Sequence, residues 1–371
     1  MRKGWEYKSF ETCINKLPKP KQVKTSEYSS GTKYPIISQE DKLISGYYDD
    51  ESYVFHIDSP VVIFGDHTRV LKYVDFDFVV GADGVKIISP KRELNAKFLL
   101  YYLQWYKIPN LGYSRHYKLL KEIRIPLPPK STQLAIVSEL DKINELIRLK
   151  KEQLKDFDNL AQSLFYEMFG DPVENEKGWE VKKLDNVCNI TSSKRIFADE
   201  YTNTGIPFYR SKEVIERSKG LPISVELFIS EERYNEIKEK FGVPKIGDIL
   251  ITAVGTIGKI WAIDTDNKFY FKDGNLVWLK DIDNQLANSC FFRRLLEYLI
   301  EEYKKTNANG AAYNALTIAK LKLMSCPLPP LPLQQLFAQR IEQIEREKSE
   351  VQKSIQDLET LLASRMQYWF E

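Results

Sequence analysis

The chain has 371 residues, and at ~150 residues per domain this length predicts two or three folding units. Hydrophobic residues make up 43% and charged residues 29%, as in an ordinary soluble protein, and no apolar run approaches the roughly 20 residues that span a bilayer. The net charge of +2 excludes a uniformly basic nucleic-acid-binding protein, although local basic patches remain possible.

The cysteines and the first residues predict a cytoplasmic protein. Cys13, Cys188, Cys290 and Cys326 lie far apart, and none forms a CxxC pair. We therefore expect buried, reduced thiols rather than zinc ligands or disulfides, and no metal or cofactor. No apolar stretch of the signal-peptide type follows the first residues.

The first predicted unit, residues 1–128, mixes strand-like runs with polar loops. Residues 60–65 and 85–88 are predicted as strands, and 98–106 as a helix rich in Leu and Tyr. Residues 107–124 carry five Lys or Arg against one Glu, and the first 24 residues carry seven against two. From charge alone, a DNA-binding face and a solvated face without function explain these clusters equally well.

A long helix is predicted next, within residues 129–171. Apolar residues recur at alternating steps of three and four, which is the heptad pattern of a coiled coil. Neither Gly nor Pro interrupts residues 133–169, and Gly170-Asp171-Pro172 is expected to end the helix.

A second unit of the same kind is predicted at residues 172–329. Residues 245–252 and 276–279 are predicted as strands, and 289–303 as a helix. A second long heptad helix is predicted within residues 330–371, and Pro332 suits its first turn.

The two halves of the chain repeat each other. Pro126-Leu127-Pro128-Pro129 recurs 201 positions later as Pro327-Leu328-Pro329-Pro330, and the offset persists to the end of the chain. Lys3-Gly4-Trp5-Glu6 recurs as Lys177-Gly178-Trp179-Glu180, and Tyr34-Pro35-Ile36 is echoed by Ile206-Pro207-Phe208. Identical pairs along the helices are Gln133 and Gln334, Ile143 and Ile344, Asp156 and Asp357, Leu160 and Leu361, Ser163 and Ser364, and Phe169 and Phe370.

The two helices are predicted to bury their apolar stripes against each other. Parallel and antiparallel pairing are both topologically possible; we expect the antiparallel form, which relates the halves by a pseudo-two-fold axis. Two unrelated helices, each packed on its own domain, are the alternative, and their equal length and register argue against it. The predicted coiled-coil residues are Leu140, Ile143, Leu154, Phe157, Ile341, Ile344, Ile355 and Leu358.

No motif predicts catalysis. Gly255-Thr256-Ile257-Gly258-Lys259 lacks the earlier Gly and the final Ser or Thr of a phosphate-binding loop. Asp171 and Glu180 do not form a nuclease-like pair of metal-binding carboxylates. The glycine-rich cofactor loop and the Pro-Pro-aromatic motif of DNA methyltransferases are absent. We therefore expect no catalytic residues.

The repeated PLPP-x3-Q segment at the start of a long heptad helix resembles the conserved regions of Type I restriction-modification specificity subunits. Met168-Phe169-Gly170-Asp171-Pro172, followed by Lys177-Gly178-Trp179, looks like the junction into their second target recognition domain. Gly247 to Leu250, followed by Val254 to Lys259, is similar to a segment common in those domains. The first domain departs from this pattern, because Gly65 to Arg69 lacks the Gly-x-x-Gly-Lys ending.

This resemblance implies an α+β fold with two globular α/β target recognition domains, separated by two long helices that form an antiparallel coiled coil. It also implies a non-catalytic, sequence-specific DNA-binding subunit that recognises a bipartite, asymmetric target in double-stranded DNA. The implied partners are two methyltransferase subunits and ATP-dependent restriction subunits. A coiled-coil scaffold with two protein-binding domains and no DNA contact is the alternative, and the near-neutral charge favours it.

Loops rich in Lys, Arg, Ser, Thr and Asn are the predicted DNA contacts, since these side chains bind phosphates and base edges. In the first domain the candidates are Lys19, Lys21, Lys24, Ser30, Thr32, His67, Arg69, Ser114 and Arg115. In the second they are Ser193, Lys194, Arg195, Arg210, Lys212, Thr256, Lys259, Asn307 and Asn309.

Overall fold

The computed structural model describes residues 2, 4–31, 33–82, 84–112, 114–306 and 315–371. Contacts between Cα atoms divide the chain into unit 1, residues 1–154 with 350–371, and unit 2, residues 155–349. Within the described residues, no helix combines the length and the apolar character that a membrane crossing requires. The domain boundaries predicted at residues 128, 171 and 329 stay predictions.

The described residues of unit 1 form three small sheets. A four-stranded sheet has the order β3-β2-β7-β4, a three-stranded sheet has the order β6-β5-β8, and β1 pairs with β9. All strand pairs are antiparallel except β2 with β7. The bounds are β1 Glu6–Ser9, β2 Tyr34–Ile37, β3 Gly46–Tyr48, β4 Val54–Phe55, β5 Val61–Gly65, β6 Leu71–Val74, β7 Phe78–Val80, β8 Val85–Ile88 and β9 Arg124–Leu127, with helices α1 Phe10–Cys13, α2 Ala96–Tyr106 and α3 Tyr117–Lys121.

Helix α2 supplies much of the core of unit 1. The Asn95 side chain accepts a hydrogen bond from the Phe98 amide at 3.0 Å and caps the helix, which satisfies one amide that the first turn leaves free. Phe98 and Leu99 are fully buried, and they belong to one cluster with Phe64 of β5 and Leu140 of the long helix α4, Lys130–Phe169. The helix predicted at 98–106 is therefore confirmed, two residues longer at its start.

Unit 2 has the corresponding sheets. The orders are β11-β18-β15-β16 and β12-β14-β13-β17, and β10 pairs with β19. The bounds are β10 Glu180–Lys183, β11 Asn189–Thr191, β12 Tyr201–Thr202, β13 Ile206–Tyr209, β14 Phe228–Ile229, β15 Ile249–Thr252, β16 Ile260–Ala262, β17 Tyr270–Phe271, β18 Leu276–Lys280 and β19 Ser325–Leu328, with helices α5 Ser211–Ser218, α6 Glu231–Phe241, α7 Ser289–Thr306 and α8 Ile318–Leu323.

The predicted strand at residues 245–252 is shorter than expected. Only Ile249–Thr252 is extended, because the Asp248 carboxylate accepts a hydrogen bond from the Lys245 amide at 3.0 Å and closes a turn. Gly247 in this turn has a φ of +90°, a conformation that favours glycine.

The two units share one topology. In unit 1, β5 pairs antiparallel with β6 and β8, and in unit 2, β15 pairs in the same way with β16 and β18. The parallel pair β2 and β7 corresponds to the parallel pair β13 and β17. The weak echo between residues 34–36 and 206–208 therefore marks the same strand in each unit.

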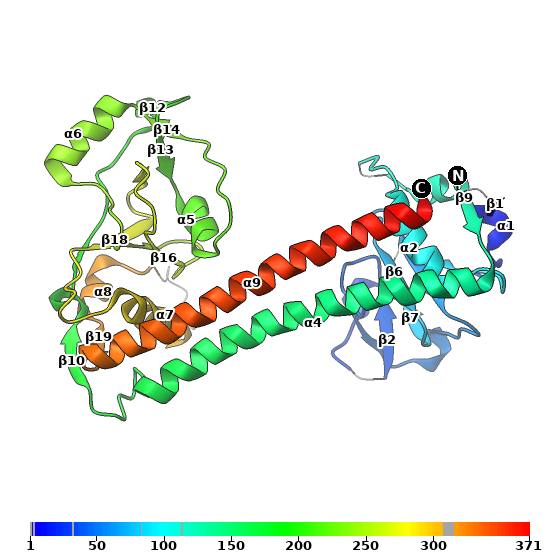
Figure 1. Ribbon diagram of the computed structural model, residues 1–371, viewed down its shortest axis with the longest axis horizontal. Helices are drawn as coiled ribbons and strands as arrows, with labels where there is room; N and C mark the ends of the chain where they lie inside the picture. Colours follow the sequence, from blue (N-terminus) through cyan, green and yellow to red (C-terminus); the bar gives the residue numbers. More distant parts are fainter. Residues whose placement is uncertain (1, 3, 32, 83, 113, 307–314) are drawn as a thin grey trace. The chain divides into compact units, whose positions relative to one another are not determined.

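Within each unit, the segments of the long helices α4 (Lys130–Phe169) and α9 (Leu331–Phe370) lie side by side and run antiparallel (Figure 1). In unit 1, Glu139 pairs with Arg365 and Lys151 pairs with Glu359. Residue numbers therefore rise along α4 where they fall along the neighbouring part of α9, as antiparallel pairing requires. In unit 2 the same holds, since Asp158 pairs with Lys348 at 2.8 Å and Phe165 contacts Phe337.

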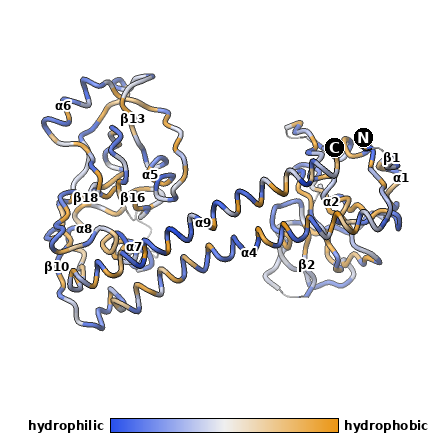
Figure 2. Tube along the Cα trace, viewed as in Figure 1, coloured by the Kyte–Doolittle hydropathy of each residue, from blue (hydrophilic) through white to orange (hydrophobic). Residues whose placement is uncertain are grey.

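The apolar stripes of both helices are covered, as the heptads predicted. Figure 2 shows hydrophobic positions recurring along α4 and α9 among hydrophilic ones. Five of the predicted coiled-coil residues are at most 8% exposed, namely Leu140, Ile143, Ile341, Ile344 and Ile355. The other three, Leu154, Phe157 and Leu358, are half-buried.

Candidate nucleic-acid interface

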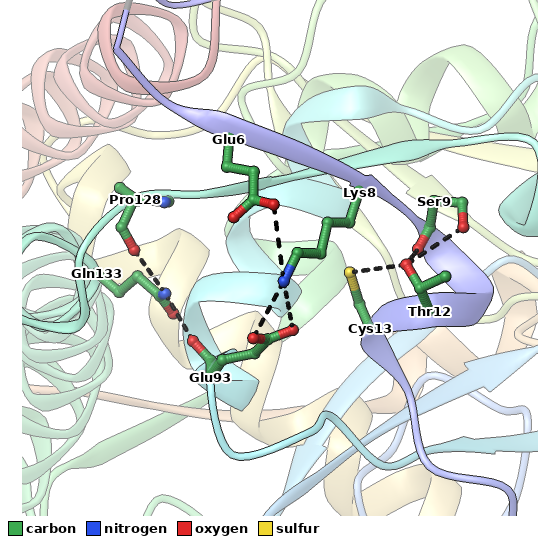
Figure 3. Close-up of polar contacts among 8 residues, drawn as sticks. All are labelled: Glu6, Lys8, Ser9, Thr12, Cys13, Glu93, Pro128 and Gln133. Atoms are coloured by element: carbon green, nitrogen blue, oxygen red, sulfur yellow. Dashed lines mark hydrogen bonds and ion pairs between the residues drawn. The ribbon is translucent and has the colours of Figure 1, made fainter.

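A buried glutamine fixes the start of each long helix to the domain before it. The Gln133 amide group donates to the carbonyl oxygens of Glu93 and Pro128, both at 2.9 Å (Figure 3). Its oxygen accepts from the Asn95 amide at 2.8 Å. Gln133 thereby joins the PLPP strand, the start of α2 and the start of α4. Its side chain is 1% exposed, so these bonds are shielded from water.

Gln334 makes the same bonds in unit 2. It donates to Leu286 and Pro329 at 2.9 and 2.8 Å, and it accepts from the Asn288 amide at 2.8 Å. The repeated PLPP-x3-Q motif is therefore a structural brace that places the long helix on its domain.

The described part of the repeated Lys-Gly-Trp element, Gly4-Trp5 in unit 1 and Lys177-Gly178-Trp179 in unit 2, lies at the C-terminal end of a long helix in each unit. In unit 2, the Trp179 indole N–H donates to the Phe169 carbonyl oxygen at 2.8 Å, and the Lys177 ammonium donates to the Glu167 carbonyl oxygen at 2.5 Å. In unit 1, the Arg2 guanidinium lies 5.3 Å from the Trp5 ring centre and donates to the Tyr368 carbonyl oxygen at 2.8 Å. Cations here satisfy the last free carbonyls of a helix.

In unit 1, a buried histidine joins two of the predicted DNA-contact loops. The His116 ring is fully buried, and its Nε2 accepts a hydrogen bond from the Leu111 amide at 3.0 Å. Its Nδ1 must therefore carry the proton, which it donates to the Asp66 carbonyl oxygen at 2.9 Å. The Asp66 carboxylate also accepts from the Tyr117 amide at 2.7 Å. We call residues 65–69 with the described part of 110–117 loop cluster 1.

Loop cluster 1 brings together four of the predicted DNA-contact residues: His67, Arg69, Ser114 and Arg115. Arg69 has a φ of +62°, and its guanidinium donates to the Ile108 carbonyl oxygen at 3.2 Å. Arg115 is exposed, whereas His67 and Ser114 are half-buried. The cluster thus presents at least one exposed Arg next to His116, whose hydrogen bonds join the two loops.

The other candidates of unit 1 lie on the segment from residue 15 to 31. Lys19, together with Lys16, Lys86 and Lys121, lines an open groove of about 640 Å³ beside Tyr117. Lys21 lies 5.0 Å from the Tyr53 ring centre, and the Lys24 amide donates to Glu27. Ser30 is exposed, and Thr32 lies outside the described residues.

Sequence reasoning missed two residues that contact loop cluster 1, Gln39 and Lys86, and a third, Lys72, that binds the segment on either side of Gln39. Gln39 accepts hydrogen bonds from the His67 amide at 3.3 Å and the Thr68 hydroxyl at 2.7 Å. The Lys86 ammonium lies 3.8 Å from the buried Asp66 carboxylate. Lys72, 6% exposed, donates to the carbonyl oxygens of Ser38 and Lys42, and burial lowers the pKa of this ammonium. Lys72 lies in β6, a strand that was not predicted, so no sequence signal pointed to it.

The corresponding turn of unit 2 has the same backbone bonds. The Ala253 amide donates to the Asn275 carbonyl oxygen, and the Ala253 carbonyl accepts from Leu316, as Asp66 does with Gly84 and His116. Inside the turn, the buried Thr252 hydroxyl accepts from the Lys259 amide at 2.9 Å. We call residues 252–259 loop cluster 2. Thr256 is exposed on it and Lys259 is half-buried, while Asn307 and Asn309 lie outside the described residues.

Three of the remaining candidates in unit 2 form ion pairs. Arg195 pairs with Asp273 at 2.8 Å. The Glu226 carboxylate pairs with Lys212 at 2.7 Å and Arg210 at 2.8 Å, and these hydrogen bonds lower its pKa to about 2. A phosphate would have to compete with these carboxylates for all three cations.

The last two candidates of unit 2 lie just before Arg195. The Lys194 amide donates to the Tyr270 hydroxyl at 2.6 Å, and its ammonium lies 5.1 Å from the Phe241 ring centre. Ser193 is half-buried. No hydrogen bond or ion pair in the described part of the chain joins these two residues to loop cluster 2.

The family model of the Type I restriction modification DNA specificity domain matches residues 3–156 and again residues 176–360. The chain belongs to this family. The resemblance seen in the repeated PLPP-x3-Q helices is thus confirmed, and so is the predicted function in DNA specificity.

Curated relatives have matching names. A Haemophilus influenzae protein that carries the name of a type I restriction enzyme specificity subunit is 29% identical over 302 residues, which cover 77% of this chain and 74% of the relative. The Methanocaldococcus jannaschii MjaIX specificity subunit is 29% identical over 237 residues, or 59% of this chain and 53% of the relative.

Solved structures support the fold. One solved structure concerns complex assembly and conformational transition of the type I R-M system. It has a TM-score of 0.62 at 20% identity, and the match covers 100% of this chain and 98% of the other. The Type I S subunit from M. genitalium has a TM-score of 0.54 at 17% identity, covering 98% and 95%. The predicted architecture of recognition domains and long helices is confirmed.

Proposed function

We propose that this chain selects the DNA sequence for a Type I restriction-modification complex and performs no chemistry itself. Residues 1–128 bind one half of a split, asymmetric target, and residues 172–329 bind the other half, each through the major groove. The observation that carries this proposal is the repeated domain, in which loop clusters 1 and 2 follow the same strand with the same backbone hydrogen bonds.

Contacts to DNA come from the loop candidates named above. Lysines such as Lys19 bind phosphates and position the domain, because an ammonium has no fixed geometry for a base edge. Arginines such as Arg115 can donate two hydrogen bonds to guanine. The two kinds of contact are distinguishable, because a phosphate contact affects all sequences equally.

The proposed partners are two methyltransferase subunits and, where restriction occurs, ATP-dependent restriction subunits. The duplicated helices support two methyltransferase subunits, since each half of the chain offers an equivalent helix. The protein would act in the cytoplasm, where the DNA is.

A domain exchange tests the proposal. Residues 172–329 are replaced by the matching domain of a relative with a different target, and methylated sites are mapped across the genome. One half of the methylated sequence should change and the other half should stay. Changes in both halves, or in neither, would refute independent recognition by the two domains.

Salt dependence separates DNA recognition from the alternative, a scaffold that does not bind DNA. The net charge of +2 favours this scaffold. A protein that neutralises several phosphates releases their counterions, so its affinity for DNA falls by roughly 10³–10⁵ between 50 and 200 mM salt. The assembled complex should show this fall on a target duplex. DNA binding that is absent at both salt concentrations would support the scaffold.

A further inference from the structure

Lys72 is a charged residue in an apolar place. It lies in β6 opposite Ile63 of β5, on the same face of the strand as Val74, because side chains two residues apart point the same way. Ile63 and Val74 belong to one buried apolar cluster. Lys72 is 6% exposed, and no carboxylate in the described chain forms an ion pair with it. A buried ammonium without a counter-ion costs free energy, and a methionine of similar length would fill this place without that cost.

The Lys72 ammonium holds the segment that follows β2. It donates to the carbonyl oxygens of Ser38 at 2.9 Å and Lys42 at 2.5 Å. No backbone–backbone hydrogen bond joins residues 38–44 to any other part of the described chain. Side-chain donors therefore have to place this segment, and the Lys72 ammonium binds it at two points.

Gln39, in the same segment, contacts loop cluster 1. Its carbonyl oxygen accepts a hydrogen bond from the Thr68 hydroxyl at 2.7 Å, and its side-chain oxygen accepts one from the His67 amide at 3.3 Å. Two glycines leave room for this approach. A Cβ atom on Gly65 would lie 3.0 Å from the Gln39 Cβ, and one on Gly84 would lie 2.6 Å from the Gln39 Oε1. The position of Gln39 is therefore coupled to that of loop cluster 1.

Unit 2 has a tryptophan at the position of Lys72. Ile63 pairs with Lys72 across β5 and β6, and Leu250 pairs with Trp261 across β15 and β16. Ile63 and Leu250 each stand two residues before the loop cluster of their unit begins. Lys72 and Trp261 are therefore structurally equivalent.

Trp261 also contacts the segment after the equivalent strand. Helix α5 follows β13 as residues 38–42 follow β2, and the Arg217 guanidinium of α5 lies 5.8 Å from the Trp261 ring centre. Val214 of α5 belongs to one buried cluster with Trp261. Both units thus brace this segment from the same position, by an ammonium on carbonyl oxygens in unit 1 and by an aromatic ring in unit 2.

We propose that Lys72 is a positioning residue for base recognition by unit 1. This rests on the proposed function. The ammonium holds residues 38–42, Gln39 in that segment holds the turn of loop cluster 1, and the turn presents its side chains to one half of the target. Lys72 itself is buried and does not touch DNA.

Competition binding tests the proposal on the full-length chain in its assembled complex. The probes are a duplex with the sequence that the wild-type complex methylates and every single-base variant of that duplex. Lys72→Met should lower discrimination between bases about ten-fold, the loss expected for one base contact, and only in the half-site bound by residues 1–128. The half-site bound by residues 172–329 should be read as in wild type. Lys72→Gln, which is too short to replace the ammonium, serves if Lys72→Met does not fold, and the same loss is expected.

Thr68→Val tests whether Lys72 acts through Gln39. It removes the hydroxyl that donates to the Gln39 carbonyl oxygen. Lys72→Met should therefore lower discrimination much less in a Thr68→Val background than in wild type. Losses that add fully in the double variant would overturn the proposal, because the two residues would then act independently.

Val74→Ala is the matched control. It removes methyl groups from the same buried face of β6, so it should lower the melting temperature of the chain and leave base discrimination unchanged. Equal losses of discrimination in Val74→Ala and Lys72→Met would overturn the proposal, as would wild-type discrimination in Lys72→Met. A wild-type complex that discriminates no base in either half-site would instead refute the proposed function.

Discussion

The carboxylate of Glu139 on α4 accepts a hydrogen bond from the Trp369 indole on α9 at 2.9 Å. The same carboxylate also forms an ion pair with Arg365. The aligned residues in unit 2 are Arg340 for Glu139, Leu164 for Arg365 and Met168 for Trp369. Although the helices repeat, this polar contact therefore belongs to unit 1 alone.

Replacing Glu139 should change how the stability of unit 1 depends on pH. The hydrogen bond from Arg365 lowers the pKa of this carboxyl below its ordinary 4.5. The carboxylate therefore stabilises the fold above pH 4.5, and this contribution falls as the pH drops through the lower folded-state pKa. Wild type should exceed Glu139→Gln in free energy of unfolding at pH 7, and the gap should narrow below pH 4.5. Urea unfolding at several pH values measures this difference in the free energy of unfolding. A difference that does not depend on pH would contradict a stabilising role for the Glu139 carboxylate.

Gln133→Ala should destabilise unit 1 by about 3 kcal/mol. The change leaves the Asn95 amide and two carbonyl oxygens without their partner in a buried place, and each such group costs roughly 1–3 kcal/mol, with partial relief from water. Urea unfolding followed by tryptophan fluorescence measures the loss. Gln162→Ala, at an exposed position of the same helix, is the control and should lose under about 0.5 kcal/mol.

Phe370→Ala should cost unit 1 about 3–5 kcal/mol, the usual range for a buried phenylalanine. Phe370 is 4% exposed, and its ring centre lies 5.5 Å from that of Phe98 and 5.6 Å from that of Tyr102. Differential scanning calorimetry measures the loss for Phe370→Ala as a lower melting temperature. Gln367→Ala, which removes an exposed side chain, should change the melting temperature little. Equal melting temperatures for both variants would mean that Phe370 does not hold the core together.

The long helices and their pairing could be predicted because their signals are local and periodic. Leu140 and Ile143 are spaced for one helical face, and both are buried. Gln133 was visible as a repeated residue, but its bonds to Glu93 and Asn95 depend on a loop forty residues away along the chain. A periodic pattern contains no information on such contacts.

The candidate interface was harder to predict for the same physical reason. Arg210 and Glu226 are 16 residues apart, and Arg195 and Asp273 are 78 apart, so the sequence did not indicate that these arginines are paired. No motif marks His116 in the sequence, and only the fold reveals that this buried residue joins two loops. Residue type indicates which side chains can bind DNA, whereas tertiary contacts determine which of them are free to do so.

Arg115→Ala should relax one base position of the target and cost about 1–3 kcal/mol in DNA binding. Arg115 is exposed on loop cluster 1 and has no ion pair within the described residues. Competition binding against every single-base variant of the target measures this. Arg195→Ala, whose guanidinium pairs with Asp273, should have a smaller effect. Uniform weakening across all variants would reassign Arg115 to a phosphate contact.

The position of Phe370 has a consequence for the order in which the chain folds during translation. Unit 2 is one continuous stretch of sequence, whereas unit 1 needs residues 350–371 in addition to 1–154. The ribosome therefore makes the first recognition domain early but adds Phe370, whose aromatic side chain completes the core of that domain, only after all of unit 2. Unit 2 receives the equivalent Phe169 before its own sheets are synthesised. The half of the protein that is made second is thus the half that can finish folding first, and the nascent first half has to wait for the last turn of α9.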